Sequence, residues 1–326
     1  MELVREAGDP SGARLLTIVV PSYRHEAYVE ECLRSIDNAE LASRIDLIVI
    51  DDGSPDTTLE RAVAFRFRDA LTLRIYSKPN SGLVDSLARG LALASTPYVA
   101  FMASDDFYST PGLDRVLALL ASKPRREICW VCQAMYLDGR DGELVYGSHL
   151  ARIGDLPADA RLRALSIEHP KPLLLQSTVF STEMLRSVGP WSGVEELDDW
   201  PTFIRVAEMA TTEDVDFRYW PDLLLTRYRQ HGGGVHNDTS RQLRLCLQVV
   251  NNVVRPEFRS EATAHVYSDL SLVFLYQRKF LSALRLYWHA LLTRPTPATA
   301  LRGPIRVIRS ILKRLSGTFE HGSAAQ

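Results

Sequence analysis

Apolar runs and helical patterns alternate along the first third of this 326-residue chain. Four mostly apolar runs have the length and composition of strands buried on both faces: Leu15 to Val20, Ile45 to Ile50, Leu71 to Tyr76 and Tyr98 to Ala103. Apolar residues recur at near-helical spacing between them, from Glu26 to Ala39 and from Leu83 to Ala94. Strands that alternate with helices in this way predict an α/β fold, a Rossmann-like, mostly parallel sheet flanked by helices.

Pairs of aspartates follow two of these strands. Asp51 and Asp52 end the second strand, and Asp105 and Asp106 follow the fourth. Parallel strands share a direction, so all four carboxylates are expected at one crevice beyond the carboxyl ends of the strands. One or two carboxylates, completed by the phosphates of a substrate, can hold a hard divalent cation there. The alternative for the second pair is that it only caps the helix that begins near Pro111.

A helix that starts near Ser81 is expected to aim its N-terminal amides at the same crevice, where a phosphate can bind.

The pattern changes beyond residue 120. Glu127 to Leu137 and Leu144 to His149 are predicted as antiparallel strands, and Ala151 to Pro172 as an irregular stretch with a short helix, Asp159 to Leu165. Further on, the expected elements are a strand at Gln176 to Phe180, a helix at Thr182 to Val188, a helix after Trp200, and strands at Asp214 to Trp220 and Leu223 to Tyr228. The acids Glu195 and Glu196 are interpreted as a solvated helix start.

Composition narrows the class of protein. Hydrophobic residues make up 46% of the chain and charged residues 24%, which is usual for a globular protein, and the net charge of -2 gives no case for nucleic acid binding. Cys129 and Cys132 have the spacing of a zinc or redox half-site, but a strand points them to opposite faces, which predicts buried structural thiols. No run of 18 apolar residues and no secretory signal is present, so a cytoplasmic protein is expected.

The last part of the chain is predicted to be helical and basic. Ser268 to Leu292 resembles a helix pair, and between Arg278 and Phe319 there are nine Lys or Arg and no acid. Ile305, Ile308, Leu312 and Leu315 share one face of a basic amphipathic helix. Such a helix is typical of attachment to the inner, anionic face of a membrane. The equally open alternative is that the helix packs on its own domain. We expect an N-terminal tail (1–14), a main domain (15–240, halves 15–121 and 122–240) and a helical extension (241–326).

Four short motifs resemble one family in order and spacing. They are Val20-Pro21-Ser22-Tyr23, Ile50-Asp51-Asp52-Gly53-Ser54, Asn80-Ser81-Gly82-Leu83 and Ala103-Ser104-Asp105-Asp106. Together they resemble the nucleotide-sugar half of a family 2 glycosyltransferase with the GT-A fold, which implies an inverting transfer from a nucleoside diphosphate sugar, a UDP-sugar above all.

The resemblance implies a role for each matching residue. Pro21 and Tyr23 flank the nucleoside base, Asp52 bonds the base or ribose, and Asn80, Gly82 and Ser104 lie beside the nucleotide. Asp105 and Asp106 match the Asp-x-Asp region that holds Mg²⁺ or Mn²⁺ across the diphosphate. A further family Asp is replaced here by Ala103, which leaves the number of ligands open. Arg229 and His231 match residues of a loop that closes over the diphosphate or metal; for His231 a purely structural role is as open.

Asp198 and Asp199, before an aromatic helix that contains Arg205, match the family's acidic pair, whose second acid is the general base. Crowded carboxylates raise one another's pKa, which suits acceptance of a proton from an alcohol.

The expected acceptor is a carbohydrate or a lipid-linked saccharide, as in bacterial surface polysaccharide or glycolipid synthesis. A phospho-receiver module is disfavoured because the matching motifs run far beyond its length. The remaining alternative is a non-catalytic nucleotide-sugar binder or scaffold of the same fold. Neither the sugar nor the acceptor can be read from the sequence.

Overall fold

A computed structural model describes residues 1–8, 13–68, 71–122, 127–137, 142–168, 173–229 and 238–305. The chain forms two compact units. The first contains the described residues within 1–162 and 173–229, and the second those within 163–168 and 238–305.

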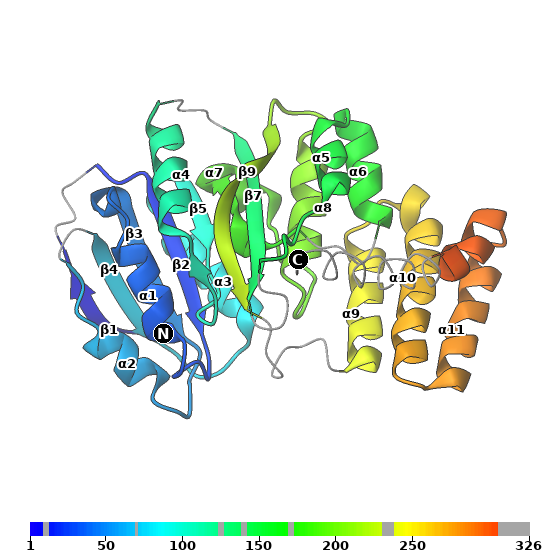
Figure 1. Ribbon diagram of the computed structural model, residues 1–326, viewed down its shortest axis with the longest axis horizontal. Coiled ribbons are helices and arrows are strands. Elements are labelled where there is room, and N and C mark those ends of the chain that lie inside the picture. Colours follow the sequence, from blue (N-terminus) through cyan, green and yellow to red (C-terminus); the bar gives the residue numbers. More distant parts are fainter. Residues whose placement is uncertain are drawn as a thin grey trace, which may run out of the picture. The chain divides into compact units, whose positions relative to one another are not determined.

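The first unit is built on a nine-stranded sheet with the order β1-β4-β3-β2-β5-β8-β7-β9-β6 (Figure 1). The strands are β1 Glu2–Ala7, β2 Leu16–Ser22, β3 Ile45–Asp51, β4 Thr72–Ser77, β5 Tyr98–Phe101, β6 Phe107–Tyr108, β7 Ile128–Leu137, β8 Thr178–Ser181 and β9 Asp216–Arg229. Strands β4, β3, β2 and β5 are parallel neighbours, as predicted. β8 then runs antiparallel to both β5 and β7.

Helices cover both faces of the sheet (Figure 1). The helical elements of this unit are α1 Val29–Asp37, η1 Ala42–Arg44, α2 Thr58–Ala64, α3 Leu83–Leu93, α4 Thr110–Ser122, α5 Ser148–Asp155, α6 Ala158–Ile167 (which continues into the second unit), η2 Leu175–Ser177, α7 Thr182–Val188 and α8 Asp199–Met209. Apolar residues of α1, α2 and α4 share one core with alternate residues of the strands, Ile18, Leu47 and Leu73 among them. On the opposite face α3 approaches β2 closely, because a Cβ at Gly90 would lie 2.2 Å from Val19 Cγ1.

Three regions depart from the prediction. Residues 2–7, expected within an N-terminal tail, form β1 and pair antiparallel with β4. The expected strand Leu144 to His149 is wrong: Leu144 makes only an isolated bridge to Met135, and α5 begins at Ser148. The two strands expected between residues 214 and 228 are one strand, β9, because a register shift against β7 absorbs the interruption at Pro221.

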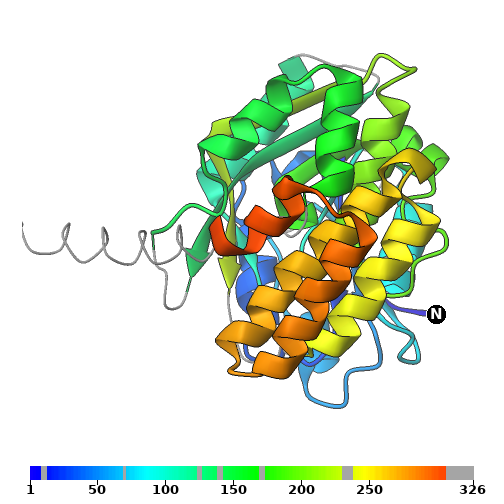
Figure 2. The same ribbon diagram turned by 90° about the vertical axis from the view of Figure 1, so that its right-hand side faces the viewer.

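The second unit contains three long helices, α9 Thr239–Asn252, α10 Pro256–Tyr276 and α11 Phe280–Thr293, followed by a helical stretch at 297–305. Helix α10 contacts both α9 and α11 and lies between them (Figure 1), and Figure 2 shows the three helices from the side of α11. The predicted helix pair of α10 and α11 is confirmed. Most of the predicted basic helix falls on 306–326, outside the described residues. In the part of the chain that the structure describes, no helix has the length and apolar character needed to cross a membrane.

Candidate functional site at the carboxyl edge of the sheet

The sequence motifs converge on the edge of the sheet where the parallel strands end. Pro21 and Ser22 close β2, and Asp51 closes β3 directly beside them, in register with Ser22. Tyr23 follows and is 37% exposed, with the Arg24 guanidinium over its ring. Ser22 Oγ and Asp51 Oδ1 are buried and have no hydrogen-bond partner in the part of the chain that the structure describes. This edge therefore presents polar groups that the chain itself leaves unsatisfied.

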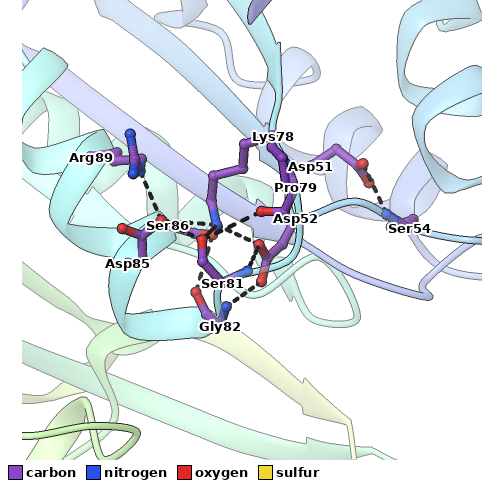
Figure 3. A network of polar contacts seen from close by, with 10 residues as sticks. All are labelled: Asp51, Asp52, Ser54, Lys78, Pro79, Ser81, Gly82, Asp85, Ser86 and Arg89. Atoms are coloured by element: carbon purple, nitrogen blue, oxygen red, sulfur yellow. Dashed lines mark hydrogen bonds and ion pairs between the residues drawn. The ribbon is translucent and has the colours of Figure 1, made fainter. Parts of the chain in front are cut away.

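Asp52 is the centre of a charge network at the start of α3 (Figure 3). Its buried carboxylate pairs with the Lys78 ammonium and accepts hydrogen bonds from the backbone amides of Ser81 and Gly82, each at 2.8 Å. Lys78 lies 2.9 Å from Asp85 as well. The anion at this helix N-terminus is thus the chain's own carboxylate, in the position where we expected a phosphate. Asn80, beside it, is exposed.

Asp105 and Asp106 lie just beyond β5 and contact the end of β9. Asp106 is buried, and its carboxylate accepts hydrogen bonds from the Arg229 backbone amide at 2.7 Å and from Gln176 Nε2 at 3.4 Å. The Arg229 side chain donates to the Asp105 carbonyl at 3.0 Å and reaches Glu31 at 2.7 Å. Burial, and then the neighbouring Asp105 carboxylate, raise the pKa of Asp106 well above its usual range. A cation bound here would relieve that cost.

The loop after β2 reaches the same pair through His25. Its Nδ1 is hydrogen-bonded to the buried Ser104 hydroxyl at 2.7 Å, and its Nε2 lies 3.7 Å from Asp105 Oδ2. The imidazole therefore connects the loop after β2 to the acidic pair.

Asp198 and Asp199 stand at the start of α8. The Leu175 amide donates to Asp199 Oδ1 at 2.7 Å. Burial is the main cause that raises the pKa of both carboxyls; it brings Asp198 to about 6, and the Asp198 charge raises the pKa of Asp199 further. These shifts act in the direction that a proton acceptor needs.

The short helix η2 joins the two acidic pairs. Two consecutive residues contact them: Leu175 bonds Asp199, and Gln176 bonds Asp106. Gln176 Oε1 is buried and has no hydrogen-bond partner among the described residues. Burial, and then the charges of Asp106, Asp199 and Asp105, raise the pKa of Tyr228, which places its hydroxyl close to the same cluster. An unsatisfied acceptor between the two acidic pairs suits a hydroxyl-rich ligand.

The carboxylate oxygens of Asp105 and Asp106 fit Mg²⁺ or Mn²⁺ when a bound ligand supplies further oxygen atoms. No group of three His, Cys, Asp or Glu side chains that could hold a metal ion occurs among the described residues. Asp105 and Asp106 are hard oxygen donors, and Asp105 keeps 18% of its side chain exposed. This arrangement fits a cation held by one or two carboxylates and by ligand phosphates, not a cage made by the protein alone. His231, the third predicted ligand, lies outside the described residues.

Three residues of the site were missed from the sequence: His25, Lys78 and Gln176. Lys78 had a readable signal, because a lysine at the end of a buried strand needs a buried acid. His25 and Gln176 gave no such signal, since their partners are 79 and 70 residues away in sequence.

Comparison with known proteins shows which family the sequence resembles. The sequence profile of glycosyl transferase family 2 matches residues 17–159. The uncharacterized glycosyltransferase EpsJ of Bacillus subtilis strain 168 is 34% identical over 102 residues, 31% of this chain and 29% of that protein. A PGL/p-HBAD biosynthesis glycosyltransferase of Mycobacterium bovis BCG is 24% identical over 195 residues, 59% of this chain and 70% of that protein. The chain thus spans less than a third of EpsJ.

Solved structures support the fold. Staphylococcus aureus TarS residues 1–349, in complex with UDP-GlcNAc, superposes with a TM-score of 0.58 at 14% identity over 89% of both chains. The mannosyltransferase PcManGT of Pyrobaculum calidifontis, in complex with GDP-Man and Mn²⁺, gives a TM-score of 0.51 at 20% identity over 93% of this chain and 82% of that one. The fold predicted from the motifs is confirmed: residues 17–159 match glycosyl transferase family 2, and the chain has the fold of the GT-A glycosyltransferases.

Proposed function

We propose that the chain is an inverting glycosyltransferase that moves a sugar from a nucleoside diphosphate sugar, a UDP-sugar first, to an acceptor hydroxyl. The observation that carries the proposal is the η2 bridge, where Leu175 and Gln176 tie the Asp199 and Asp106 carboxylates into one site. In this site Asp105 and Asp106 act on the leaving diphosphate, and the pair of Asp198 and Asp199 acts on the incoming acceptor hydroxyl. The match of residues 17–159 to glycosyl transferase family 2 and the nucleotide-sugar complexes of TarS and PcManGT support the same donor class.

Each residue has a defined task in this proposal. Asp199 accepts the proton of the acceptor hydroxyl; the Leu175 amide holds Oδ1 and so turns Oδ2 toward the acceptor. The acceptor oxygen bonds to the anomeric carbon as the bond to the diphosphate oxygen breaks on the opposite face, which inverts that carbon. Asp105 and Asp106 would hold Mg²⁺ or Mn²⁺, and the bound cation supplies Lewis-acid stabilisation of the leaving diphosphate. Arg229 keeps the acidic pair in place from the end of β9.

Nucleotide contacts come from the β2 and β3 ends. Pro21 and Tyr23 flank the base. Ser22 Oγ and Asp51 Oδ1, which have no hydrogen-bond partner among the described residues, lie at the same strand ends. Asp52, already bonded to Lys78 and two amides, fixes the loop of Asn80 and Gly82 beside the nucleotide and offers its remaining lone pairs to the base or ribose. The acceptor we propose is a carbohydrate or a lipid-linked saccharide of a bacterial surface polymer or glycolipid.

A thermal-shift screen tests the donor assignment. The purified protein is heated with UDP, dTDP, GDP or CMP, each with Mn²⁺ and with a chelator. We expect one diphosphate to raise the melting temperature in a metal-dependent way, and slow hydrolysis of the matching nucleotide sugar. Stabilisation without any hydrolysis or transfer would indicate a non-catalytic binder instead. If no nucleotide raises the melting temperature, the assignment of this sheet edge is wrong.

A further inference from the structure

Helix α11 presents an unusually apolar outer surface. The side chains of Leu281, Leu284, Trp288 and Leu292 are 85%, 65%, 59% and 64% exposed. Their spacing of three, four and four residues sets them in one stripe along the helix. We call these four residues the α11 stripe. The opposite side of α11, with Ala283, Leu286 and Ala290, is buried and packs on α10. The stripe is therefore separate from the packing surface of the helix.

Basic residues accompany the stripe. Arg285 is exposed and projects beside Leu281 and Trp288 on the helical wheel, and Arg278 and Lys279 are exposed at the turn before α11. None of these three forms an ion pair with another described residue, whereas Arg294 pairs with Glu261 and Arg302 with Asp269. No Asp or Glu occurs from residue 270 to residue 319.

We propose that the α11 stripe docks the chain on an anionic lipid bilayer surface, with the four apolar side chains in the interface and the three basic residues at the headgroups. An apolar helical face with Trp, edged by Lys and Arg, is the form of an interfacial helix. Each basic residue near an anionic leaflet adds attraction. The inference concerns a surface distinct from the sheet edge and does not depend on the transfer reaction.

A second copy of this chain is a poorer occupant of the stripe. A symmetric dimer brings the same patch of both copies together, so Arg285 and its basic neighbours would face their own equivalents. The stripe region offers no acid to balance them. An anionic lipid surface complements this charge, and a dimer does not.

Vesicle flotation tests the proposal on the full chain without nucleotide or sugar. We expect binding to vesicles of phosphatidylcholine with 30% phosphatidylserine, weak binding to pure phosphatidylcholine, and release by high salt. Replacing all four stripe residues with Gln should lower the partition coefficient by at least about 50-fold, and Leu281→Gln alone by roughly tenfold. Leu144→Gln, at a residue 51% exposed in the first unit, is the matched control and should leave binding unchanged.

The charge contribution has its own pair of variants. Arg285→Gln should weaken binding roughly fivefold, while Arg244→Gln, at an exposed arginine of α9, should not. Fluorescence gives a second readout, because Trp288 is the most exposed of the five tryptophans and should shift to the blue on binding; Trp288→Phe should lose that shift.

Two results overturn the proposal. One is vesicle binding that is absent, or that persists unchanged in the four-residue variant. The other is a wild-type dimer in sedimentation that becomes a monomer in that variant, which would assign the stripe to a second copy of the chain. Far-UV circular dichroism and urea unfolding check that the variants remain folded, as expected for exposed side chains.

Discussion

The Asp-Asp pairs that follow β3 and β5 have the same sequence but opposite surroundings. At the end of β3, Asp52 is bonded to the Lys78 ammonium and to two backbone amides, and Asp51 accepts the Ser54 amide at 3.0 Å. At the end of β5, no lysine reaches the pair among the described residues, and burial raises the pKa of Asp106. In the first pair the Asp52 charge is balanced by the chain itself, while Asp51 keeps one oxygen without a hydrogen-bond partner among the described residues. The second pair, like Asp198 and Asp199, retains a cost that a cation or a proton can relieve.

This difference separates structural carboxylates from reactive ones. A carboxylate paired with a buried lysine and helix amides stays ionised and orders its loop. A buried carboxylate with few donors becomes a strong ligand for a cation or a good proton acceptor. The predictions below test whether the three pairs really differ in this way, from the largest expected effect to the smallest.

The largest effect is expected at Asp199. Asp199→Asn removes the proton acceptor but can keep the Leu175 amide bond, so kcat should fall by roughly 10²–10⁴-fold while nucleotide still raises the melting temperature. Transfer assays and thermal shift, run side by side, measure both. Asp222→Asn, at an exposed aspartate, is the control. Unchanged turnover would remove Asp199 from the mechanism.

The second test compares the β5 and β3 pairs directly. Asp105→Asn should abolish the Mn²⁺-dependent part of nucleotide binding, with a loss of roughly 10²-fold in kcat/KM. Asp52→Asn should weaken nucleotide binding equally with Mn²⁺ and with a chelator, because its partners are protein groups. Calorimetric titration of each variant with nucleotide, in Mn²⁺ and in chelator, measures both effects on binding. If nucleotide binding by the two variants depends on metal to the same extent, the proposed difference between the β5 and β3 pairs is wrong.

Stability should respond in opposite ways at the two pairs. Lys78→Met leaves the buried Asp52 carboxylate without its cation, which should lower the free energy of unfolding by about 3 kcal/mol. Arg89→Met removes only the more exposed partner of Asp85 and should leave the free energy of unfolding nearly unchanged. Asp106→Asn removes a charge whose burial is unfavourable, so the variant should be at least as stable as wild type. Urea unfolding in chelator is the measurement, and a destabilised Asp106→Asn would contradict the contrast.

The smallest effect concerns pH. Burial raises the pKa of Asp198 to about 6, above its value in the unfolded chain. The folded state therefore binds more protons between about pH 4 and 6, and this contribution to stability is present below that range and lost as pH rises through it. Unfolding of wild type and Asp198→Asn across this range should show the difference. Transfer should rise with pH as Asp199, whose pKa is raised too, loses its proton. If the difference in free energy of unfolding between wild type and Asp198→Asn does not change with pH, the raised pKa of Asp198 is contradicted.

Much of the fold follows from local pattern. The four parallel strands and the helices after β2 and β4 were predicted close to their observed bounds, because buried parallel strands are continuous apolar runs. β1 escaped prediction because its mixed polar sequence is an edge strand, held by pairing with β4 and not by burial. The helix at Ser148 was missed because its first two residues were assigned to the expected strand Leu144 to His149, and its eight residues are too few to establish a helical period.

The candidate site, like the fold, has a part that the sequence predicts and a part that only the tertiary structure shows. The sequence by itself determined which residues end the parallel strands, and so brought Asp52, Asp105 and Asp106 to one edge, because the direction of parallel strands fixes where their ends lie. Only the tertiary structure decided that Lys78 neutralises Asp52, that His25 meets Asp105, and that η2 joins Asp106 to Asp199. Those contacts depend on side chains that approach through space from distant segments, and no local pattern of the chain encodes the balance of charge that results.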